Sequence, residues 1–205
     1  MKKKILLHPP FLNSNEKKYL NDTVSENWIS TAGPNISFFE DKLKKYTNSK
    51  YCVALSNGTS ALHLALKVIG VEKDDEVIVP SLTFVATANS IKYVNAIPVF
   101  IDVDFENFGM NHQSLKNFLE NYGEIRNGVT YNKITGNRIK ACLPMHTFGF
   151  PVHLDELIKI CHLWKIPIVE DAAESLGSQY KGMPTGSFGE VGAFSFNGNK
   201  IVTAG

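Results

Sequence analysis

An acid and a lysine each follow a strand-like run in the second half of this 205-residue chain. Asp171 comes after residues 166–169, and Lys200 comes after residues 191–196. Ligands of parallel α/β proteins bind at the carboxyl ends of strands, so both side chains are expected at one sheet edge. There an amine can form a Schiff base with the aldehyde of pyridoxal phosphate, and a carboxylate can pair with its protonated ring nitrogen. Taken singly, the lysine is better explained as a surface residue and the aspartate as a helix cap.

A turn of small polar residues, Ser56-Asn57-Gly58-Thr59-Ser60, lies between an apolar run and a helical pattern. Backbone N–H groups and hydroxyls at the start of a helix bind anions such as phosphate. Taken alone, the turn is explained better by Thr59 or Ser60 capping the helix. It matches neither a Walker loop nor GxGxxG, which argues against a nucleoside triphosphate or a dinucleotide.

Two more side chains are expected at the same edge. Phe84 follows a strand that ends at Pro80 and could stack on a flat ring, although a lone Phe at this spacing is more often core. Ser195 ends the last predicted strand, five residues before Lys200, within reach of a phosphate. Because all these groups follow strands on one side, the set favours a cofactor site over separate structural roles.

Alternating strands and helices must position these residues. Amphipathic helices are predicted at residues 16–28 and 37–46. Strands are predicted at 51–55, 76–79, 98–101, 139–143, 166–169 and 191–196, and helices at 59–69, 84–93, 112–121 and 154–164. This order predicts an α/β fold with a mostly parallel sheet and helices on both faces. Residues 128–138 interrupt the alternation of strands and helices. They predict a small hairpin insertion, which could be surface decoration.

Bulk properties exclude several classes of protein. The formal net charge is +1, from 21 basic and 20 acidic residues, which argues against a nucleic-acid partner. The apolar runs are too short to span a bilayer, and the basic start has no apolar stretch behind it, so neither a membrane span nor a signal peptide is expected. Three scattered cysteines fit a reducing compartment. We therefore expect a cytoplasmic protein.

No metal site is predicted. His153 and His162 flank a helix, and Cys142 and His146 lie four apart, so none shows metal-ligand spacing and all are interpreted as structural. Glu170 and Asp171 are adjacent in a strand. Their side chains should point to opposite faces, which excludes a carboxylate dyad.

Four motifs occur together in this chain. They are Asn57-Gly58-Thr59-Ser60-Ala61-Leu62, residues 80–89, Glu170-Asp171-Ala172-Ala173-Glu174, and Ser195-Phe196-Asn197-Gly198-Asn199-Lys200. In combination they resemble the DegT/StrS-type nucleotide-sugar aminotransferases, whose large domain has the aspartate-aminotransferase-like (type I) pyridoxal phosphate fold. The resemblance implies an N-terminal arm, helix and substrate loop in residues 1–35. It implies a cofactor-binding large domain in residues 36–205, incomplete at its C-terminus and lacking the family's small C-terminal domain.

The resemblance also implies a role for each motif residue. Lys200 would bond to the cofactor aldehyde and then move the proton between substrate and cofactor carbons. Asp171 would hold the ring nitrogen protonated. Thr59, the Ser60 backbone and Ser195 would bind the phosphate.

Further positions also match the family's pattern. Gly58 belongs to the phosphate turn, and Phe84 would stack on the ring. Glu174 matches a position near the ring oxygen where many relatives carry Gln or His, so the hydrogen bonding there differs. The family's N-terminal substrate loop matches Trp28, Ser30, Thr31 and Gly33.

The implied activity is transamination, because related sugar dehydratases carry histidine where this chain has Lys200. The resemblance implies glutamate as amino donor and a homodimer with shared sites. The insertion near Tyr131, residues 144–149 and residues 174–178 resemble most the branch that aminates a UDP-linked 4-keto-6-deoxy-N-acetylhexosamine, toward bacillosamine- or legionaminic-type sugars. Two alternatives stay open: a truncated or non-catalytic protein of this fold that acts as a binding or regulatory partner, and a sugar dehydratase.

Overall fold

Strand β1 (Glu76–Pro80) runs through the middle of a parallel sheet, and all five of its residues are buried. It pairs in parallel with β2 (Ile97–Ile101) on one side and β5 (Ile139–Cys142) on the other. Parallel bridges Cys142↔Ile168 and Met145↔Asp171 continue the sheet to β6 (Val169–Asp171), which pairs in parallel with β9 (Val191–Ala193). The order β2-β1-β5-β6-β9 confirms the predicted parallel α/β architecture.

The computed structural model describes residues 5, 9–12, 15–30 and 33–204. The remaining elements are the helices α1 (Glu16–Ser25), α2 (Pro34–Thr47), α3 (Gly58–Val68), α4 (Val85–Tyr93), α5 (His112–Tyr122), η1 (Thr147–Gly149) and α6 (Leu154–Leu163), and the short strands β3 (Gly123–Arg126), β4 (Val129–Asn132), β7 (Gln179–Tyr180) and β8 (Met183–Pro184).

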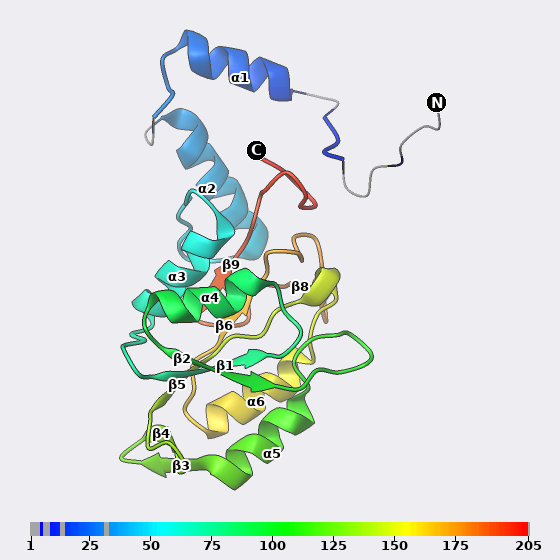
Figure 1. Cartoon of the computed structure of the whole chain (residues 1–205). Coiled ribbons are helices and arrows are strands. Elements are labelled where there is room, and N and C mark those ends of the chain that lie inside the picture. Colours follow the sequence, from blue (N-terminus) through cyan, green and yellow to red (C-terminus); the bar gives the residue numbers. More distant parts are fainter. Residues whose placement is uncertain (1–4, 6–8, 13–14, 31–32, 205) are drawn as a thin grey trace.

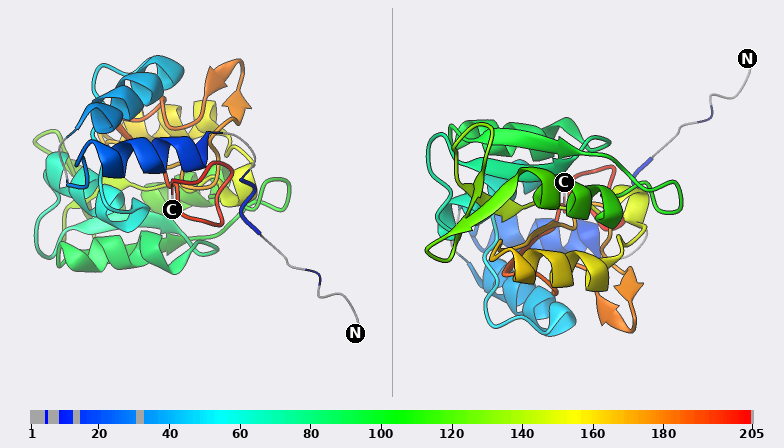
Figure 2. Two further views of the ribbon diagram at one scale, coloured as in Figure 1. Left: turned by 90° about the horizontal axis from the view of Figure 1, so that it is seen from above. Right: turned by 90° about the horizontal axis from the view of Figure 1, so that it is seen from below.

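Helices cover both faces of the sheet, as Figure 1 shows. Val77 and Val79 belong to the apolar cluster that also contains Leu66 of α3 and Ile91 of α4. Ile78 points the other way, into a second cluster with residues of α5 and α6. Alternate residues of a strand face opposite sides, so β1 serves two cores at once. Helix α1 contributes no buried residue, and the β7–β8 hairpin stands at the periphery in both views of Figure 2.

Asparagine side chains cap the starts of α3 and α5. The Asn57 side-chain oxygen accepts the Ser60 N–H at 2.8 Å at the start of α3. Asn111 accepts the Ser114 N–H in the same way, at 2.8 Å, at the start of α5. A side-chain oxygen satisfies one of the N–H groups that a helix start leaves unpaired. The α3 cap is therefore Asn57, and the expectation that Thr59 or Ser60 caps this helix is wrong.

The predicted strand at residues 51–55 is not formed. Tyr51 is 76% exposed and Val53 is 67% exposed, and the segment belongs to none of the described sheets. The Ala54 N–H donates instead to the Glu40 carboxylate of α2 at 2.7 Å. An apolar run favours a strand only where a neighbouring strand can pair with it.

The hairpin insertion is present but begins earlier than predicted. Strands β3 and β4 pair antiparallel around Asn127 and Gly128, which have positive φ values of 51° and 79°. An Asn-Gly pair in the left-handed region is the preferred two-residue hairpin turn. Residues 128–138 contain the second strand and a further turn, across which Tyr131 and Arg138 form an antiparallel bridge, so the predicted hairpin is confirmed in part and is preceded by one more strand.

Two strand ends also differ from the predictions, and both involve the candidate site. Strand β6 runs later than predicted, so Asp171 is its last residue. Strand β9 ends at Ala193, so Ser195 and Lys200 lie in the following loop. The predicted helices 59–69, 84–93, 112–121 and 154–164 are confirmed with ends shifted by a residue or so.

Candidate active site

Asp171 is a buried carboxylate at the carboxyl end of β6. It is 2% exposed, and its backbone N–H donates to Pro144 O at 2.9 Å. One carboxylate oxygen accepts the Thr87 hydroxyl at 2.8 Å, and the other accepts the Ala173 N–H at 3.1 Å. Burial raises the pKa of Asp171, and the hydrogen bonds from Thr87 and Ala173 offset this only in part. A carboxylate with this environment gains from a cationic N–H partner, which a protonated pyridine ring would supply.

Glu170 points to the opposite side of β6, as predicted. Its carboxylate accepts His146 Nε2 at 3.0 Å and three backbone N–H groups of residues 186–189 at 2.5 to 2.8 Å. The Val152 N–H donates to His146 Nδ1 at 3.3 Å, so the ring proton lies on Nε2 and is donated to Glu170. Burial is the largest influence and raises the pKa of Glu170, but His146 and the backbone donors together lower it below its ordinary value. Glu170 is fully bonded and anchors the strand that carries Asp171.

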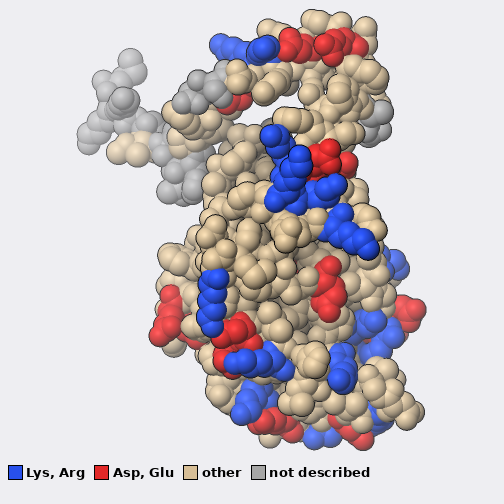
Figure 3. Space-filling model, turned by 180° about the vertical axis from the view of Figure 1, so that it is seen from behind, with Lys and Arg blue, Asp and Glu red and all other residues tan. Residues whose placement is uncertain are grey.

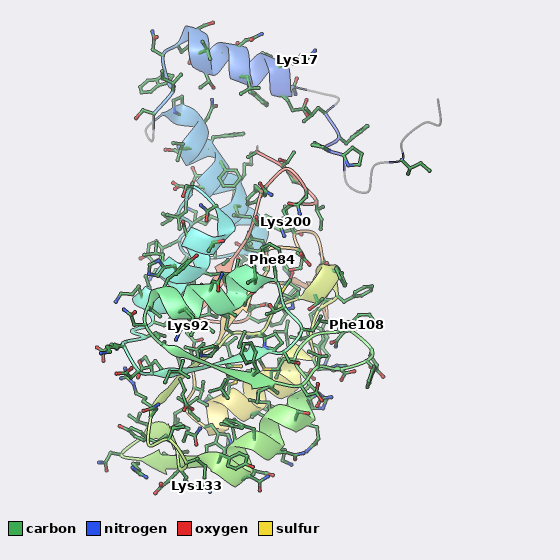
Figure 4. All side chains as sticks on the ribbon, in the orientation of Figure 1. Lys17, Phe84, Lys92, Phe108, Lys133 and Lys200 are labelled. Carbon is green, nitrogen blue, oxygen red and sulfur yellow. The ribbon has the colours of Figure 1, made fainter. Side chains whose placement is uncertain are left out.

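Lys200 reaches the same edge from the loop after β9. Its Nζ lies 3.3 Å from Glu174 Oε1 and 5.6 Å from the centre of the Phe84 ring. The lysine side chain is only 12% exposed. The second oxygen of Glu174 accepts the Phe148 N–H at 2.9 Å, which holds the carboxylate in place. Figure 4 shows Lys200 and Phe84 side by side above the sheet.

The start of α3 forms the third part of the site. A Cβ built on Gly58 would lie 3.1 Å from Ser195 Cβ and 3.3 Å from its hydroxyl oxygen, so the helix start touches the loop after β9. The Asn57 cap occupies the Ser60 N–H. The N–H groups of Gly58 and Thr59 also lie in the first turn, where helices have no internal acceptor for them. With the Ser195 hydroxyl they can receive an anion such as phosphate.

The DegT/DnrJ/EryC1/StrS aminotransferase family model matches residues 10–205. The chain belongs to this family. Its members are therefore the proper comparison for the arrangement of Asp171, Lys200 and the α3 turn.

Curated relatives cover nearly all of this chain. EpsN of Bacillus subtilis, named as a pyridoxal phosphate-dependent aminotransferase, is 40% identical over 99% of the chain and 50% of its own length. GDP-perosamine synthase of Escherichia coli O157:H7 is 38% identical over 99% of the chain and 51% of its own length. The chain thus spans about half the length of the curated relatives it matches.

Solved structures of this family share the fold. An aminotransferase from Psychrobacter cryohalolentis superposes with a TM-score of 0.84 at 29% identity, covering 96% of this chain and 46% of that one. A sugar aminotransferase from Streptococcus pneumoniae in its PMP form superposes with a TM-score of 0.83 at 30% identity, covering 98% and 50%. The same protein has also been solved in a PLP form. The predicted fold, that of a pyridoxal phosphate-dependent aminotransferase, is confirmed.

Membership of the DegT/DnrJ/EryC1/StrS family does not identify one branch of that family for this chain. The predicted bacillosamine or legionaminic branch is not singled out, since GDP-perosamine synthases of three organisms are among the relatives. The family level of the prediction is confirmed, and the branch stays a prediction.

The structure brings most of the predicted site residues together. Asp171, Glu174, Phe84 and Lys200 gather at the end of β6, while Gly58 and Ser195 touch at the start of α3. Thr59 and Ser60 follow in the first turn of α3.

Among the predicted substrate-loop residues that the structure describes, Trp28, Ser30 and Gly33, no hydrogen bond or ion pair to that group is formed. Trp28 is 46% exposed, and a Cβ on Gly33 would meet the Trp28 side chain at 3.3 Å. Ser30 is exposed, and Thr31 lies outside the described residues. The role of these four residues remains a prediction.

Two residues of the site were missed in the sequence. Thr87 of α4 binds Asp171, and Met145 lies beneath the start of α4, with its sulfur 3.0 Å from the Thr83 hydroxyl and 3.4 Å from the Phe84 nitrogen. Thr87 stands three residues after Phe84, a helical spacing that places both on one side of α4. That spacing was the available signal, but only the fold shows that Asp171 lies opposite.

Figure 3 shows basic and acidic side chains interspersed on the face that it presents. Among the described residues, none of the helices has the length and apolar content needed to cross a bilayer.

Proposed function

We propose that this chain carries the pyridoxal phosphate site of an aminotransferase that acts on nucleotide-linked sugars. The observation that carries the proposal is that a shielded Lys200 amine and the buried Asp171 carboxylate lie at one sheet edge, close enough to influence each other electrostatically. Family membership supports the same cofactor. When bound, pyridoxal phosphate supplies an electron sink that stabilises negative charge on the substrate carbon.

The chain's own residues divide the remaining work. Asp171, held by Thr87 and Ala173, would accept the ring N–H at its carboxylate and keep that proton in place. Lys200 Nζ would hold the cofactor and would serve as the general base that moves a proton. Glu174 orients the amine from 3.3 Å.

The aromatic and hydroxyl groups position the cofactor. The Phe84 ring covers one side of the place where the ring would stand and excludes water there. The first-turn N–H groups of Gly58 and Thr59, with the Ser195 hydroxyl, hold the phosphate. The Ser60 backbone N–H, which the resemblance also assigned to the phosphate, would have to leave the Asn57 cap to take part.

The names of the relatives support nucleotide-linked sugars as the substrate class. Three curated relatives are GDP-perosamine synthases, and a 33% identical one is a UDP-4-amino-4-deoxy-L-arabinose–oxoglutarate aminotransferase. A solved relative, DesI, was crystallised with its TDP-sugar product at 26% identity. The nucleotides differ, but a nucleotide-linked amino sugar is common to all. Within this class we propose a UDP-linked 4-keto-6-deoxy-N-acetylhexosamine as acceptor and glutamate as donor, with the GDP-linked keto sugar as the alternative.

The proposed assembly is a homodimer with shared sites in the cytoplasm. Residues 1–35 would form the arm and substrate loop, and residues 36–205 the cofactor-binding unit. The exposed aromatic and aliphatic residues of α1 and of the following loop, Tyr19, Leu20, Trp28 and Ile29, support a role in contacts beyond this chain.

Trapping the cofactor on its lysine tests the proposal. The purified chain is mixed with pyridoxal phosphate, reduced with borohydride and mapped by peptide mass spectrometry. We expect the label on Lys200, lost in Lys200→Ala and retained in Lys181→Ala, a 67% exposed lysine that serves as control. A label elsewhere, or none, contradicts the assignment.

Catalysis is tested in a separate, unreduced sample of the chain with pyridoxal phosphate by adding glutamate. A transaminase converts the bound cofactor to its amine form, which shifts the visible absorbance, whereas a non-catalytic binding protein leaves the spectrum unchanged. With the correct nucleotide sugar, Lys200→Ala should lower turnover by more than about a hundredfold.

A further inference from the structure

Three metal-ligating side chains meet in a part of the fold that the proposed cofactor chemistry does not use. Asp104, His112 and His153 each place one ligand atom within 4.8 Å of the others. In the sequence, His153 was considered together with His162, which lies at the other end of the same helix. In the structure, the histidine next to His153 is His112. The two imidazole rings have centroids 5.3 Å apart and planes at 81°.

Two helix starts and one loop build this cluster. His112 is the first residue of α5, held there by the Asn111 cap. His153 directly precedes the first residue of α6. The apolar faces of α5 and α6 pack in one core cluster through Leu115 and Leu157, which brings the two histidines together.

Asp104 comes from the loop that follows β2, at the right of Figure 1. Its Oδ1 accepts the Glu106 N–H at 2.8 Å, and its backbone N–H donates to Gly109 O at 2.8 Å. These bonds leave Oδ2 directed at His153 Nε2, 3.8 Å away, with the Asn111 side-chain amide 3.5 Å from the same oxygen. The carboxylate is therefore oriented by the loop's own backbone, in the way that ligating carboxylates are held by their surroundings.

One atom of the cluster is left without a partner. His112 Nδ1 is buried and has no hydrogen bond to any of the described residues. A buried unpaired polar atom is rare in a folded protein, and where one occurs it often faces a bound ion or an ordered water. The ring also lines a cavity of about 300 Å³ between α5 and α6.

We propose that Asp104, His112 and His153 form a site for a divalent transition metal, with Zn²⁺ the best fit. Two imidazoles and one carboxylate are a frequent three-ligand zinc set, whereas Ca²⁺ and Mg²⁺ prefer sets made of oxygen alone. Donor atoms at zinc-bond lengths in a tetrahedron stand about 3.3 Å apart, so the three ligand atoms, which lie within 4.8 Å of one another with His153 and Asp104 at 3.8 Å, would have to draw together when the ion binds. Glu106, whose carboxylate lies 3.6 Å from His153 Nε2, or a water can complete the coordination.

The ion would tie the loop after β2 to the start of α6. That loop already touches the segment beside the candidate active site, because the Thr147 hydroxyl donates to Phe108 O at 3.1 Å. Phe108 is marked on the loop in Figure 4. The neighbouring His146 N–H donates to Asp171 O at 3.1 Å. A bound ion would therefore stabilise the loop that contacts the segment beside Asp171. The existence of this metal site does not depend on the proposed function.

Metal titration of the full chain tests this site directly. The chain is stripped with a chelator, freed of pyridoxal phosphate and titrated with Zn²⁺ by calorimetry and with Co²⁺ by visible absorbance. We expect one equivalent to bind and the Co²⁺ spectrum to show a low-symmetry site with nitrogen and oxygen ligands. His153→Asn and Asp104→Asn should each weaken binding by more than about tenfold, since even the loss of groups behind the ligands costs that much.

His162→Ala is the matched control, an exposed histidine of the same helix that should bind like wild type. Asparagine at position 153 retains a residue that favours helix starts, and circular dichroism together with urea unfolding shows that each variant is folded. Absence of stoichiometric binding, or equal losses in His162→Ala and His153→Asn, overturns the proposal.

Discussion

At the residue scale, β6 carries two adjacent carboxylates whose surroundings act in opposite directions. Glu170 receives four hydrogen bonds, from His146 and the backbone of residues 186–189, and its pKa falls below the ordinary value. Asp171 receives two, from Thr87 and Ala173, and burial raises its pKa. The strand thus uses one acid to hold its own position, and in the proposed site the other is available to the cationic ring nitrogen.

Asp171→Asn should stabilise the cofactor-free chain at neutral pH. Because the folded-state pKa of Asp171 is raised, its contribution to stability is present below the unfolded pKa, about 3.9, and is lost as the pH rises through the folded pKa. Asparagine cannot ionise, so the variant does not lose this stability at neutral pH. The Thr87 hydroxyl can donate a hydrogen bond to the amide oxygen or accept one from the amide nitrogen. Urea unfolding at several pH values measures the difference, which should shrink as the pH falls toward 4.

The exposed Asp41→Asn is the control and should show no such pH-dependent gain, since Asp41 retains 63% side-chain exposure. A less stable Asp171→Asn chain at pH 7 would mean that the buried carboxylate is already satisfied. The same variant should bind pyridoxal phosphate more weakly, because the ring N–H then lacks its anionic partner.

At the scale of elements, close backbone approaches decide how the strand ends meet. Gly192 of β9 lies so near Gly186 that an added Cβ would stand 2.8 Å from the Gly186 Cα. This contact folds residues 186–192 back across β6, where their N–H groups reach Glu170. At the other end, Gly58 allows the start of α3 to touch Ser195. The helix start and the β9 loop can therefore share one anion.

Gly58→Ala should impair cofactor binding more than folding. The new Cβ would lie 3.1 Å from Ser195 Cβ, which is tight enough to displace the serine, while alanine is better tolerated within a helix than glycine. We expect pyridoxal phosphate affinity to fall by about tenfold, equivalent to about 1.4 kcal/mol, with little change in the unfolding midpoint. Absorbance titration and urea unfolding separate the two effects.

Gly198→Ala provides the comparison in the same loop, because a Cβ there meets no atom within 4 Å. It should leave both measurements near wild type. Equal losses of affinity in the two variants would show that loop rigidity, and not the contact with Ser195, governs phosphate binding.

At the scale of the whole molecule, part of the apolar surface has no cover within the described chain. Alternate residues of the extended segment 51–55 are exposed, and Tyr51, Val53 and Leu55 retain 76%, 67% and 43% of their surface. The relatives are about twice as long as this chain. Contiguous exposed apolar residues commonly mark an interaction surface.

Val53→Lys should reduce self-association of the chain at high concentration. A charged side chain in the middle of the exposed segment makes its burial against another molecule costly. Light scattering over a concentration series should show a lower average mass than for wild type. Val68→Lys is matched in exposure, 68% against 67%, but lies at the far end of α3, so it should behave like wild type. Equal effects of the two lysines would place the association elsewhere.

The sequence by itself determined most of the helices and strands, their order and the candidate site residues. Helix periodicity and the motif around Lys200 are local patterns, which can be recognised without knowledge of the fold. Only the tertiary structure decided which residues meet. Thr87 with Asp171, Glu174 with Lys200, and His112 with His153 join distant parts of the chain through the strand order β2-β1-β5-β6-β9. The exposed segment 51–55 shows the same limit, because an apolar run becomes a strand only when the fold supplies a neighbour whose backbone can pair with it.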